Sequence, residues 1–450
     1  MKNETSARAR LPIVLSLLLV GAVVAIALGA ALAHFWLPRG DSVDRESRSI
    51  AAGVVFAGSY LALAVGRVPG LSIDRAGIAL VGGGLMVASG ALPLEDAYKA
   101  VDLETLSLLL GMMIVVANLR LSGFFALATA WVIARAGRSF TLLAAIVLTS
   151  GFFSAFLVND AICLVLAPLV LDLTLALKRR PAPYLLAVAM ASNVGSTATI
   201  TGNPQNIMIG GFSGIPYATF AAALAPVAAA GLVVAFALIV LFHWREFTGE
   251  TRLAAPKPKV VVNRALVIRA VAATLIMIAL FFVGVTPAKA AIVIGGLLLL
   301  TRRVKSRRVY ADIDWSLLLM FAGLFIIVAG AQRALLTPDV IAAVARLHLD
   351  QLPVLSGVTA VLSNLVSNVP AVLMLKPFVA GLPDHDKAWL TIAMASTLAG
   401  NFTVLGSIAN LIVVQRAEAS GVKISFWDYF RVGAPLTLIA LAIGTFWLSR

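Results

Sequence analysis

The sequence predicts an all-α polytopic membrane protein: an inverted repeat with two re-entrant hairpins, two broken helices and about 11 transmembrane helices. Composition is the first observation, because 61% of the 450 residues are hydrophobic and 12% are charged, whereas about one quarter of a soluble domain is charged. The second observation is a long segment that recurs in the second half of the chain. The third is that lysine and arginine gather in short connections between apolar runs.

Apolar runs long enough to cross or enter a bilayer follow one another along the chain. In the first half they cover residues 11–36, 50–66, 75–92, 103–120, 140–177, 184–212 and 217–243. In the second half they cover residues 265–285, 287–301, 313–333, 353–380, 388–415 and 431–449. The first run is too long for a signal-peptide core and is predicted to be a helix. The run 140–177 is predicted to hold a helical hairpin at residues 151–177, and the run 353–380 is predicted to form another.

Two further segments, residues 121–138 and 334–349, are only moderately apolar and follow matching helices. We expect each to form an amphipathic helix that lies in the membrane interface. Short additional spans are the alternative.

Residues 189–209, which read AMASNVGSTATITGNPQNIMI, carry the functional prediction. Pro204 lacks an N–H and clashes with the preceding turn, and Gly202 relaxes the backbone, so the helix must break here. In hydrocarbon, free backbone groups are tolerated only where they line a cavity or bind something. Residues 393–413, AMASTLAGNFTVLGSIANLIV, repeat this stretch 204 positions later without gaps. Paired broken helices predict the binding site of a transporter.

The duplication extends beyond this stretch. Two further sets of residues recur in the same order: Asp102 and Gly111 with Asp314 and Gly323, and Ser154, Asn159 and Pro168 with Ser363, Asn368 and Pro377. We therefore predict an N-terminal helix and outer loop at residues 1–49, a first repeat at 50–244, a cytoplasmic linker at 245–264 and a second repeat at 265–450.

Charge predicts the orientation of the chain. Each half has five crossings and a hairpin, and an odd number of crossings inverts the second copy. With the N-terminus in the cytoplasm and the C-terminus outside, most basic residues fall on the cytoplasmic side, as the positive-inside rule requires. The net charge of +14 thus reflects orientation in the lipid bilayer, and we expect no nucleic-acid partner. We expect a multi-pass protein of the cytoplasmic (inner) membrane.

Each predicted hairpin carries polar residues in its middle. Asn159 and Asp160 lie at the centre of the first, where an ionised carboxylate costs at least about 2.5 kcal/mol. Asp160 therefore needs a bound cation, a hydrogen-bonded cage or a proton, or it caps the following half-helix. In the second hairpin Val369 replaces the acid, and four polar residues gather nearby: Ser363, Asn364, Ser367 and Asn368. Such groups hold cations or anions, or they satisfy one another between helices.

The duplicated hairpin and broken helix resemble the ion transporter superfamily with its citrate-transporter-like domain, over about residues 50–450. That superfamily includes the divalent anion/sodium symporters, the arsenite efflux permeases and one group of sodium/proton antiporters. The GNPQN and SNVPAVL stretches are most similar to bacterial permeases described only as anion transporters. The resemblance also implies an elevator mechanism and a homodimer.

Site residues follow from the same resemblance. It implies cation or proton coupling at Asn159, Asp160, Gly202, Asn206, Asn368, Gly406 and Asn410. It implies substrate contacts at Asn159, Asp160, Asn203, Ser367, Asn368 and Ser407.

The hairpin tips depart from the symporter pattern. Residues 158–160 read Val-Asn-Asp and residues 367–369 read Ser-Asn-Val, where the symporters carry Ser-Asn-Thr. An ionised Asp160 would also repel an anion, because two unit charges about 5 Å apart cost about 3 kcal/mol at an effective dielectric constant of about 20. The Asn-Asp pair is more similar to the arsenite permeases, whose neutral or weakly acidic cargo tolerates an acid.

We therefore expect a secondary transporter that moves a small inorganic or organic anion coupled to H⁺ or Na⁺. Asp160 is the candidate for the coupling proton, because a buried carboxyl can exchange its proton for a nearby cation. An arsenite (metalloid) efflux permease and a Na⁺/H⁺ antiporter are the alternatives. The sequence has no Walker motif, no nucleophile elbow and no histidines at metal-ligand spacing, so we expect no enzyme, metal centre or cofactor.

Overall fold

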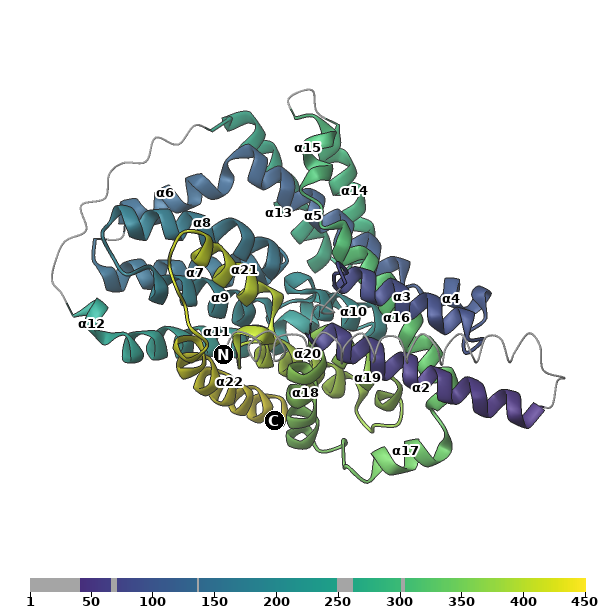
Figure 1. Ribbon diagram of the computed structural model, residues 1–450. Coiled ribbons are helices and arrows are strands. Elements are labelled where there is room, and N and C mark those ends of the chain that lie inside the picture. The colour runs from purple at the N-terminus through teal and green to yellow at the C-terminus, as the bar shows by residue number, and fades with distance from the viewer. Residues whose placement is uncertain (1–40, 66–70, 136, 249–261, 301–303) are drawn as a thin grey trace, which may run out of the picture. The chain divides into compact units, whose positions relative to one another are not determined.

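The computed structural model describes residues 41–65, 71–135, 137–248, 262–300 and 304–450. All regular structure in these residues is helical (Figure 1). The chain divides into two compact units, and each takes residues from both halves of the sequence. Unit 1 comprises Met1–Leu106, Asp314–Leu349 and Leu373–Ala380, and unit 2 comprises Ser107–Ile313, Asp350–Val372 and Gly381–Arg450. The division into two sequential repeats stays a prediction.

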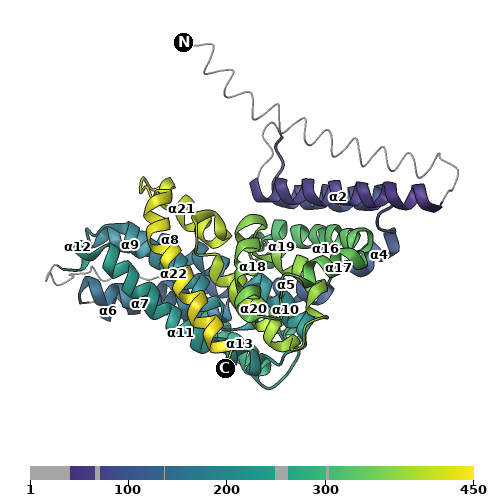
Figure 2. The same cartoon turned by 90° about the horizontal axis from the view of Figure 1, so that it is seen from below.

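Unit 1 is built around one central helix. Its helices are α2 (Asp41–Val65), α3 (Arg75–Ala88), α4 (Leu94–Ala100), α16 (Trp315–Leu335) and α17 (Pro338–Ala345). Helix α16 packs against α2, α3 and α4, and Figure 2 shows α2 running beside it. Gly323 permits the closest approach, because a Cβ there would lie 2.4 Å from the carbonyl carbon of Ala79 in α3. Helix α17, predicted to lie in the interface, has no buried residue.

Unit 2 holds the first predicted hairpin, the first arm and tip of the second, and both predicted helix breaks. Its first half contains most of α5 (Leu103–Ser122), then α6 (Phe124–Arg135), α7 (Ser139–Phe156), α8 (Asn159–Ala176), α9 (Pro181–Ser196), the 3-10 turn η1 (Ile200–Gly202), α10 (Pro204–Ser213), α11 (Tyr217–Phe242) and α12 (Trp244–Phe247). Its second half contains α13 (Arg264–Phe282), α14 (Pro287–Leu299), α15 (Ser306–Ala311), α18 (Leu352–Val366), the start of α19 (Asn368–Val379), α20 (His385–Ala399), the 3-10 turn η2 (Val404–Gly406), α21 (Ile408–Ala419) and α22 (Phe426–Leu448).

Two helices, α9 and α20, form the core of unit 2. Helix α9 packs against α7, α8, α11 and α21, and α20 packs against α10, α18 and α22. Figure 1 shows α7, α8 and α9 side by side. Glycines allow the backbones of α7 and α9 to touch, because a Cβ on Gly195 would lie 2.2 Å from the carbonyl oxygen of Gly151. Every residue of α9 from Pro183 to its end is buried.

In unit 2, large apolar side chains are exposed on the outer helices, and several polar side chains are buried in the interior. Val233 of α11 and Ile268 of α13 are each 68% exposed. Asn193, Asn203 and Asn206 are at most 1% exposed. A helix bundle with an apolar surface and a hydrogen-bonded polar interior is suited to lipid.

Seven described helices are long and apolar enough to cross a membrane: Leu103–Ser122, Ser139–Phe156, Asn159–Ala176, Tyr217–Phe242, Arg264–Phe282, Trp315–Leu335 and Phe426–Leu448. The chain is therefore an all-helical, multi-pass membrane protein. Five of the seven helices correspond to predicted spans, and the other two, Ser139–Phe156 and Asn159–Ala176, are the arms of the first predicted hairpin. The predicted spans at residues 75–92, 184–212, 287–301 and 388–415 give no helix of this length, because α3 and α14 are short and breaks interrupt α9 and α20. The predicted helix at residues 11–36 lies outside the described residues.

Contacts duplicated at the repeat spacing occur in both units. Gly111 of α5 would place a Cβ 2.5 Å from the carbonyl carbon of Ala291 in α14. Both residues lie 212 positions from their counterparts, Gly323 and Ala79, which make the same contact in unit 1. Arginines near the ends of α5 and α16 also form ion pairs, Arg120 with Asp312 and Arg333 with Asp96, although the two arginines are 213 positions apart and the two aspartates 216, so that these pairs do not keep the repeat spacing. In each pair, one residue comes from each half of the sequence.

Candidate functional site

Two helices of unit 2 stop and restart in the same way. Helix α9 ends at Ser196, the chain passes through η1, and α10 begins at Pro204. Helix α20 ends at Ala399, the chain passes through η2, and α21 begins at Ile408. Both predicted helix breaks are therefore present, and each begins several residues before the Gly-Asn-Pro or Gly-Ser element that suggested it.

One asparagine amide closes each break. Asn206 Nδ2 donates to the carbonyl oxygens of Ser196 (3.2 Å) and Thr199 (3.0 Å). These carbonyls lie at the end of α9, where a helix leaves acceptors unpaired that lipid cannot satisfy. The same pair of bonds recurs 204 positions later: Asn410 Nδ2 to the carbonyl oxygens of Gly400 (2.7 Å) and Thr403 (3.1 Å). Asn206 and Asn410, both fully buried, thus stabilise the breaks.

The residues that precede the restarted helices act as caps. Asn203 Oδ1 accepts from the backbone N–H of Asn206 at 2.9 Å. Ser407 Oγ accepts from the backbone N–H of Ala409 at 3.2 Å. A side-chain oxygen that caps a helix start stabilises it by about 1 kcal/mol.

Each break is also hydrogen-bonded to the intact part of the other helix. Asn193 of α9 accepts from Ser407 Oγ at 3.1 Å and donates to Asn410 Oδ1 at 2.9 Å. The residue 204 positions later makes the equivalent bonds: Thr397 of α20 accepts from Asn203 Nδ2 (3.1 Å) and donates to Asn206 Oδ1 (3.3 Å). Asn193 and Thr397 therefore join the two breaks into one buried network.

The tip of the first hairpin lies on this network. The turn between α7 and α8 occupies Leu157 and Val158, so Asn159 is the first residue of α8. Asn159 Nδ2 donates to Asn193 Oδ1 at 2.9 Å, and Asn159 is 4% exposed. Asp160 follows in the first turn of α8 and is half-buried. Among the described residues, none donates a hydrogen bond to Asn159 Oδ1.

The tip of the second hairpin is strained and lies against the second break. Ser367 has φ +79° and ψ 159°, a region that costs a non-glycine residue about 1–3 kcal/mol. Asn364 Nδ2 donates to the carbonyl oxygen of Ala399 at 3.1 Å. A Cβ on Gly400 would lie 3.3 Å from Asn368 Nδ2. Asn368 is 9% exposed, and within the described part of the chain its Oδ1 accepts no hydrogen bond.

Both predicted glycines are required by close packing. A Cβ on Gly202 would lie 2.0 Å from the carbonyl oxygen of Ser196, and a Cβ on Gly406 would lie 2.8 Å from that of Gly400. Each glycine therefore lets the chain fold back on the end of the preceding helix. The roles predicted for these residues in binding a substrate or a cation stay predictions.

Sequence reasoning missed Thr397 and two asparagines of the network, Asn193 and Asn401. Asn401 Oδ1 accepts from Asn193 Nδ2 at 2.9 Å, and Asn401 Nδ2 donates to the carbonyl oxygen of Met190 at 3.2 Å. The only signal was an asparagine within an apolar run. At the repeat spacing Asn193 aligns with Thr397, and Asn401 aligns with Thr197. The alignment of the two halves therefore did not mark either asparagine as a repeated residue.

Several known proteins similar to this chain are named as transporters. Residues 60–399 match the family model described as "Citrate transporter". An uncharacterised transporter of Mycobacterium tuberculosis is 30% identical over 427 residues, which cover 89% of this chain and 98% of the relative. A silicon efflux transporter of Oryza sativa subsp. japonica is 28% identical over 468 residues, which cover 88% and 96%.

The fold is similar to that of a transporter whose structure has been solved. The YdaH transporter of Alcanivorax borkumensis aligns with a TM-score of 0.52 and 15% identity, over 89% of this chain and 97% of that one. At this identity the similarity concerns the fold alone.

Proposed function

The chain belongs to the citrate transporter family and is a secondary transporter, and we propose that it moves a small inorganic or organic anion driven by Na⁺ or H⁺. The observation that carries this proposal is the pair of unpartnered oxygens, Asn159 Oδ1 and Asn368 Oδ1, at the two hairpin tips. A buried acceptor without a donor costs about 1–3 kcal/mol. A bound cation would recover that free energy at each tip.

The substrate would bind between the tips and the caps of the restarted helices. No side chain caps the start of α8 among the described residues, and the N–H groups at a helix start attract anions. Asn203 and Ser407 contribute polar groups from the breaks, and Ser367 contributes a hydroxyl from the second tip. In this proposal Asn206 and Asn410 hold the breaks open and position the oxygens that bind cations.

Asp160 would couple proton uptake to anion binding. Its carboxylate would repel an anion held near Asn159 by about 3 kcal/mol at about 5 Å and an effective dielectric constant of about 20. Protonation removes this repulsion, so the proton and the anion bind together and leave together. Protons would then drive uptake, and cations at the hairpin tips would add to the driving force.

The duplicated contacts support an inverted repeat with re-entrant hairpins. Asn159 meets α9 at Asn193, twelve residues after α9 begins at Pro181. At about 1.5 Å per residue this is roughly 18 Å along the helix, or near the middle of a hydrocarbon core of about 30 Å. We propose that the hairpins and broken helices move as an elevator, in a homodimer of the inner membrane with cytoplasmic N-termini and external C-termini.

Flux in proteoliposomes tests the proposal. A panel of labelled anions is supplied under imposed Na⁺ and pH gradients, and one class should accumulate only with a gradient. The variant Asn159→Ala with Asn368→Ala should lose at least about tenfold of this flux, since each change removes one cation ligand. Asn118→Ala is the matched control, because Asn118 is a buried asparagine of α5 outside the network. Undiminished gradient-driven flux in the double variant would refute the proposal.

Efflux of an uncharged hydroxylated solute is the second candidate. The rice relative is named a silicon efflux transporter, and an acid at position 160 tolerates a neutral cargo. Silicic acid or arsenite export from cells that lack their own exporter would favour this candidate. Sodium-dependent proton flux without any anion would instead identify a Na⁺/H⁺ antiporter.

A further inference from the structure

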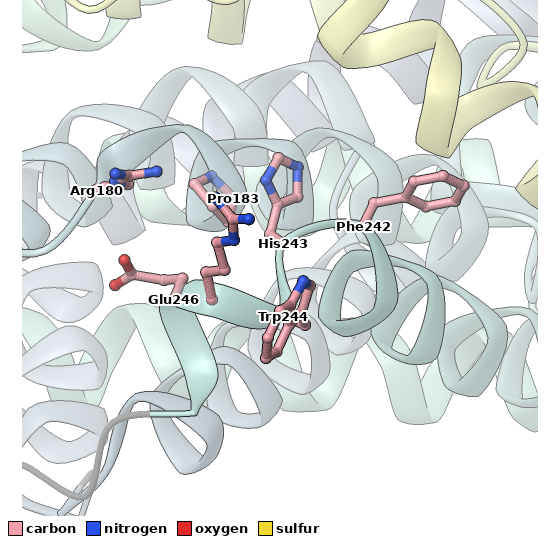
Figure 3. A pocket seen from close by; sticks show the side chains of 7 residues that line it. Arg180, Pro183, Phe242, His243, Trp244 and Glu246 are labelled. Carbon is pink, nitrogen blue, oxygen red and sulfur yellow. The ribbon is translucent and has the colours of Figure 1, made fainter.

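A separate cavity of about 320 Å³ lies in unit 2, away from the hairpin tips (Figure 3). The start of α9 and the turn between α11 and α12 form its walls. Its lining residues are Arg180, Pro183, Phe242, His243, Trp244, Arg245 and Glu246. None of these residues takes part in the proposed transport site.

Arginine dominates the charge of the cavity. Glu246 is engaged, because Arg179 Nη1 lies 3.8 Å from its Oε1 and the Tyr184 hydroxyl donates to the same oxygen at 3.4 Å. Arg180 and Arg245 are exposed, and neither has an acidic group within 4.0 Å among the described residues. Two guanidinium groups thus remain available, and their planar donors fit two oxygens of one phosphate.

A buried nitrogen also points to a polar ligand. In the described chain, His243 Nε2 is buried and has no hydrogen-bond partner. Burial lowers the pKa of His243, so its imidazole is neutral at neutral pH and one ring nitrogen carries a proton. A ligand oxygen beside Nε2 could accept that proton in a hydrogen bond, which would recover the cost of the unpaired group.

The position of the cavity indicates where its ligand comes from. Helix α11 has a mean hydropathy of 2.7 and exposes Leu241 (65%) and Phe242 (45%) just before the cavity. Trp244 follows and is 55% exposed. Tryptophan at the end of an apolar span typically lies at the level of lipid headgroups, so the two arginines lie where headgroup phosphates are.

We propose that this cavity binds the phosphate of an anionic lipid headgroup through Arg180, Arg245 and His243, with the acyl chains along the exposed face of α11. Basic cavities between transmembrane helices recognise anionic headgroups in this way. The oxygens of Glu246 would accept from a headgroup hydroxyl such as those of phosphatidylglycerol. A soluble phosphate ester shares this chemistry, and the experiment separates the two sources.

Native mass spectrometry of the purified full chain, titrated with phosphatidylglycerol or phosphatidylcholine, tests the site without measuring transport. The variant Arg180→Ala with Arg245→Ala should bind phosphatidylglycerol at least about tenfold more weakly, since both guanidinium groups that would bind the phosphate are removed. The control Arg264→Ala with Arg307→Ala, which removes two exposed arginines elsewhere, should change binding less than about twofold. Arg180→Lys with Arg245→Lys keeps the charge and should fall between them.

Competition identifies the source of the phosphate. Weaker binding in the alanine variant, with no displacement by inorganic phosphate, assigns the site to a lipid headgroup. Displacement by inorganic phosphate supports the site and assigns it to a soluble phosphate ester. Equal affinity of the alanine variant and the control variant for phosphatidylglycerol overturns the proposal.

Discussion

The two helix breaks share a framework but differ in the groups they present. Asn206 and Asn410 make the same two bonds to the preceding helix. The first break is buried throughout residues 197–206, whereas Leu405 in the second is 69% exposed. The adjacent hairpin tips differ further, with Asp160 in the first and Val369 in the second. Duplication therefore preserved the groups that hold the breaks and one asparagine at each hairpin tip, Asn159 and Asn368, whereas the residue that follows each asparagine diverged.

Alanine at the two equivalent glycines should give the largest effect and the clearest difference. Gly202→Ala would place a Cβ 2.0 Å from a backbone oxygen, whereas Gly406→Ala would place one at 2.8 Å. The buried first break cannot relax, because its neighbours are close-packed. We expect no folded Gly202→Ala protein and a reduced yield of Gly406→Ala, measured by size-exclusion chromatography. Equal yields would show that the two breaks are equally constrained.

Substitution of Asn193 or Thr397, the two residues that link the breaks, should give the next largest loss of stability, and the two losses should differ. Asn193→Leu strips partners from four buried groups, those of Asn159, Asn401, Ser407 and Asn410. At about 1–3 kcal/mol for each group, the loss exceeds about 3 kcal/mol.

Thr397→Val strips a partner from three buried groups, those of Asn203, Gln205 and Asn206. We expect a somewhat smaller loss than for Asn193→Leu, because one fewer group is affected. Thermal unfolding in detergent measures both changes. A smaller drop in Tm for Asn193→Leu than for Thr397→Val would contradict the central place given to Asn193.

The sequence predicted those members of the network that are the same residue type in both halves of the chain. Gly202 and Asn206 match Gly406 and Asn410 in type, so their importance could be inferred from the alignment. Asn193 aligns with a threonine, and it becomes informative only because α9 and α20 cross and bring it to the other break. Asn203 was predicted only as a substrate contact, and its role as a cap and its bond to Thr397 could not be inferred from the sequence.

The sequence located each hairpin tip to within two residues of the turn in the structure. Polar residues inside an apolar run indicate where a hairpin turns, yet the turn itself uses Leu157 and Val158. The sequence gives no sign of the positive φ at Ser367, because serine has no preference for that region. The number of membrane-spanning helices was predicted least well. The length and hydropathy of an apolar run do not show where a break divides it into shorter helices.

Relief of strain at the second tip should give a smaller effect of opposite sign. Ser367→Gly removes a positive-φ penalty of about 1–3 kcal/mol, offset by about 0.5–1 kcal/mol for the added freedom of the unfolded chain. We expect a modest rise in Tm. Transport should be slower, because the variant loses the Ser367 hydroxyl that is proposed to contact the substrate. Ser420→Gly, at a residue with φ −104°, is the control and should not raise Tm. A lower Tm for Ser367→Gly would mean that the tip is not strained.

The central claim is that Asp160, present at the first hairpin tip and absent from the second, couples proton uptake to transport. Flux driven by a pH gradient in proteoliposomes tests this claim most directly. Asp160→Asn should lose at least about tenfold of the proton-driven flux, because its side chain can no longer exchange a proton. Asp172→Asn, which changes an exposed acid of the same helix, should keep it. Proton-driven flux in Asp160→Asn equal to that in Asp172→Asn would contradict the account.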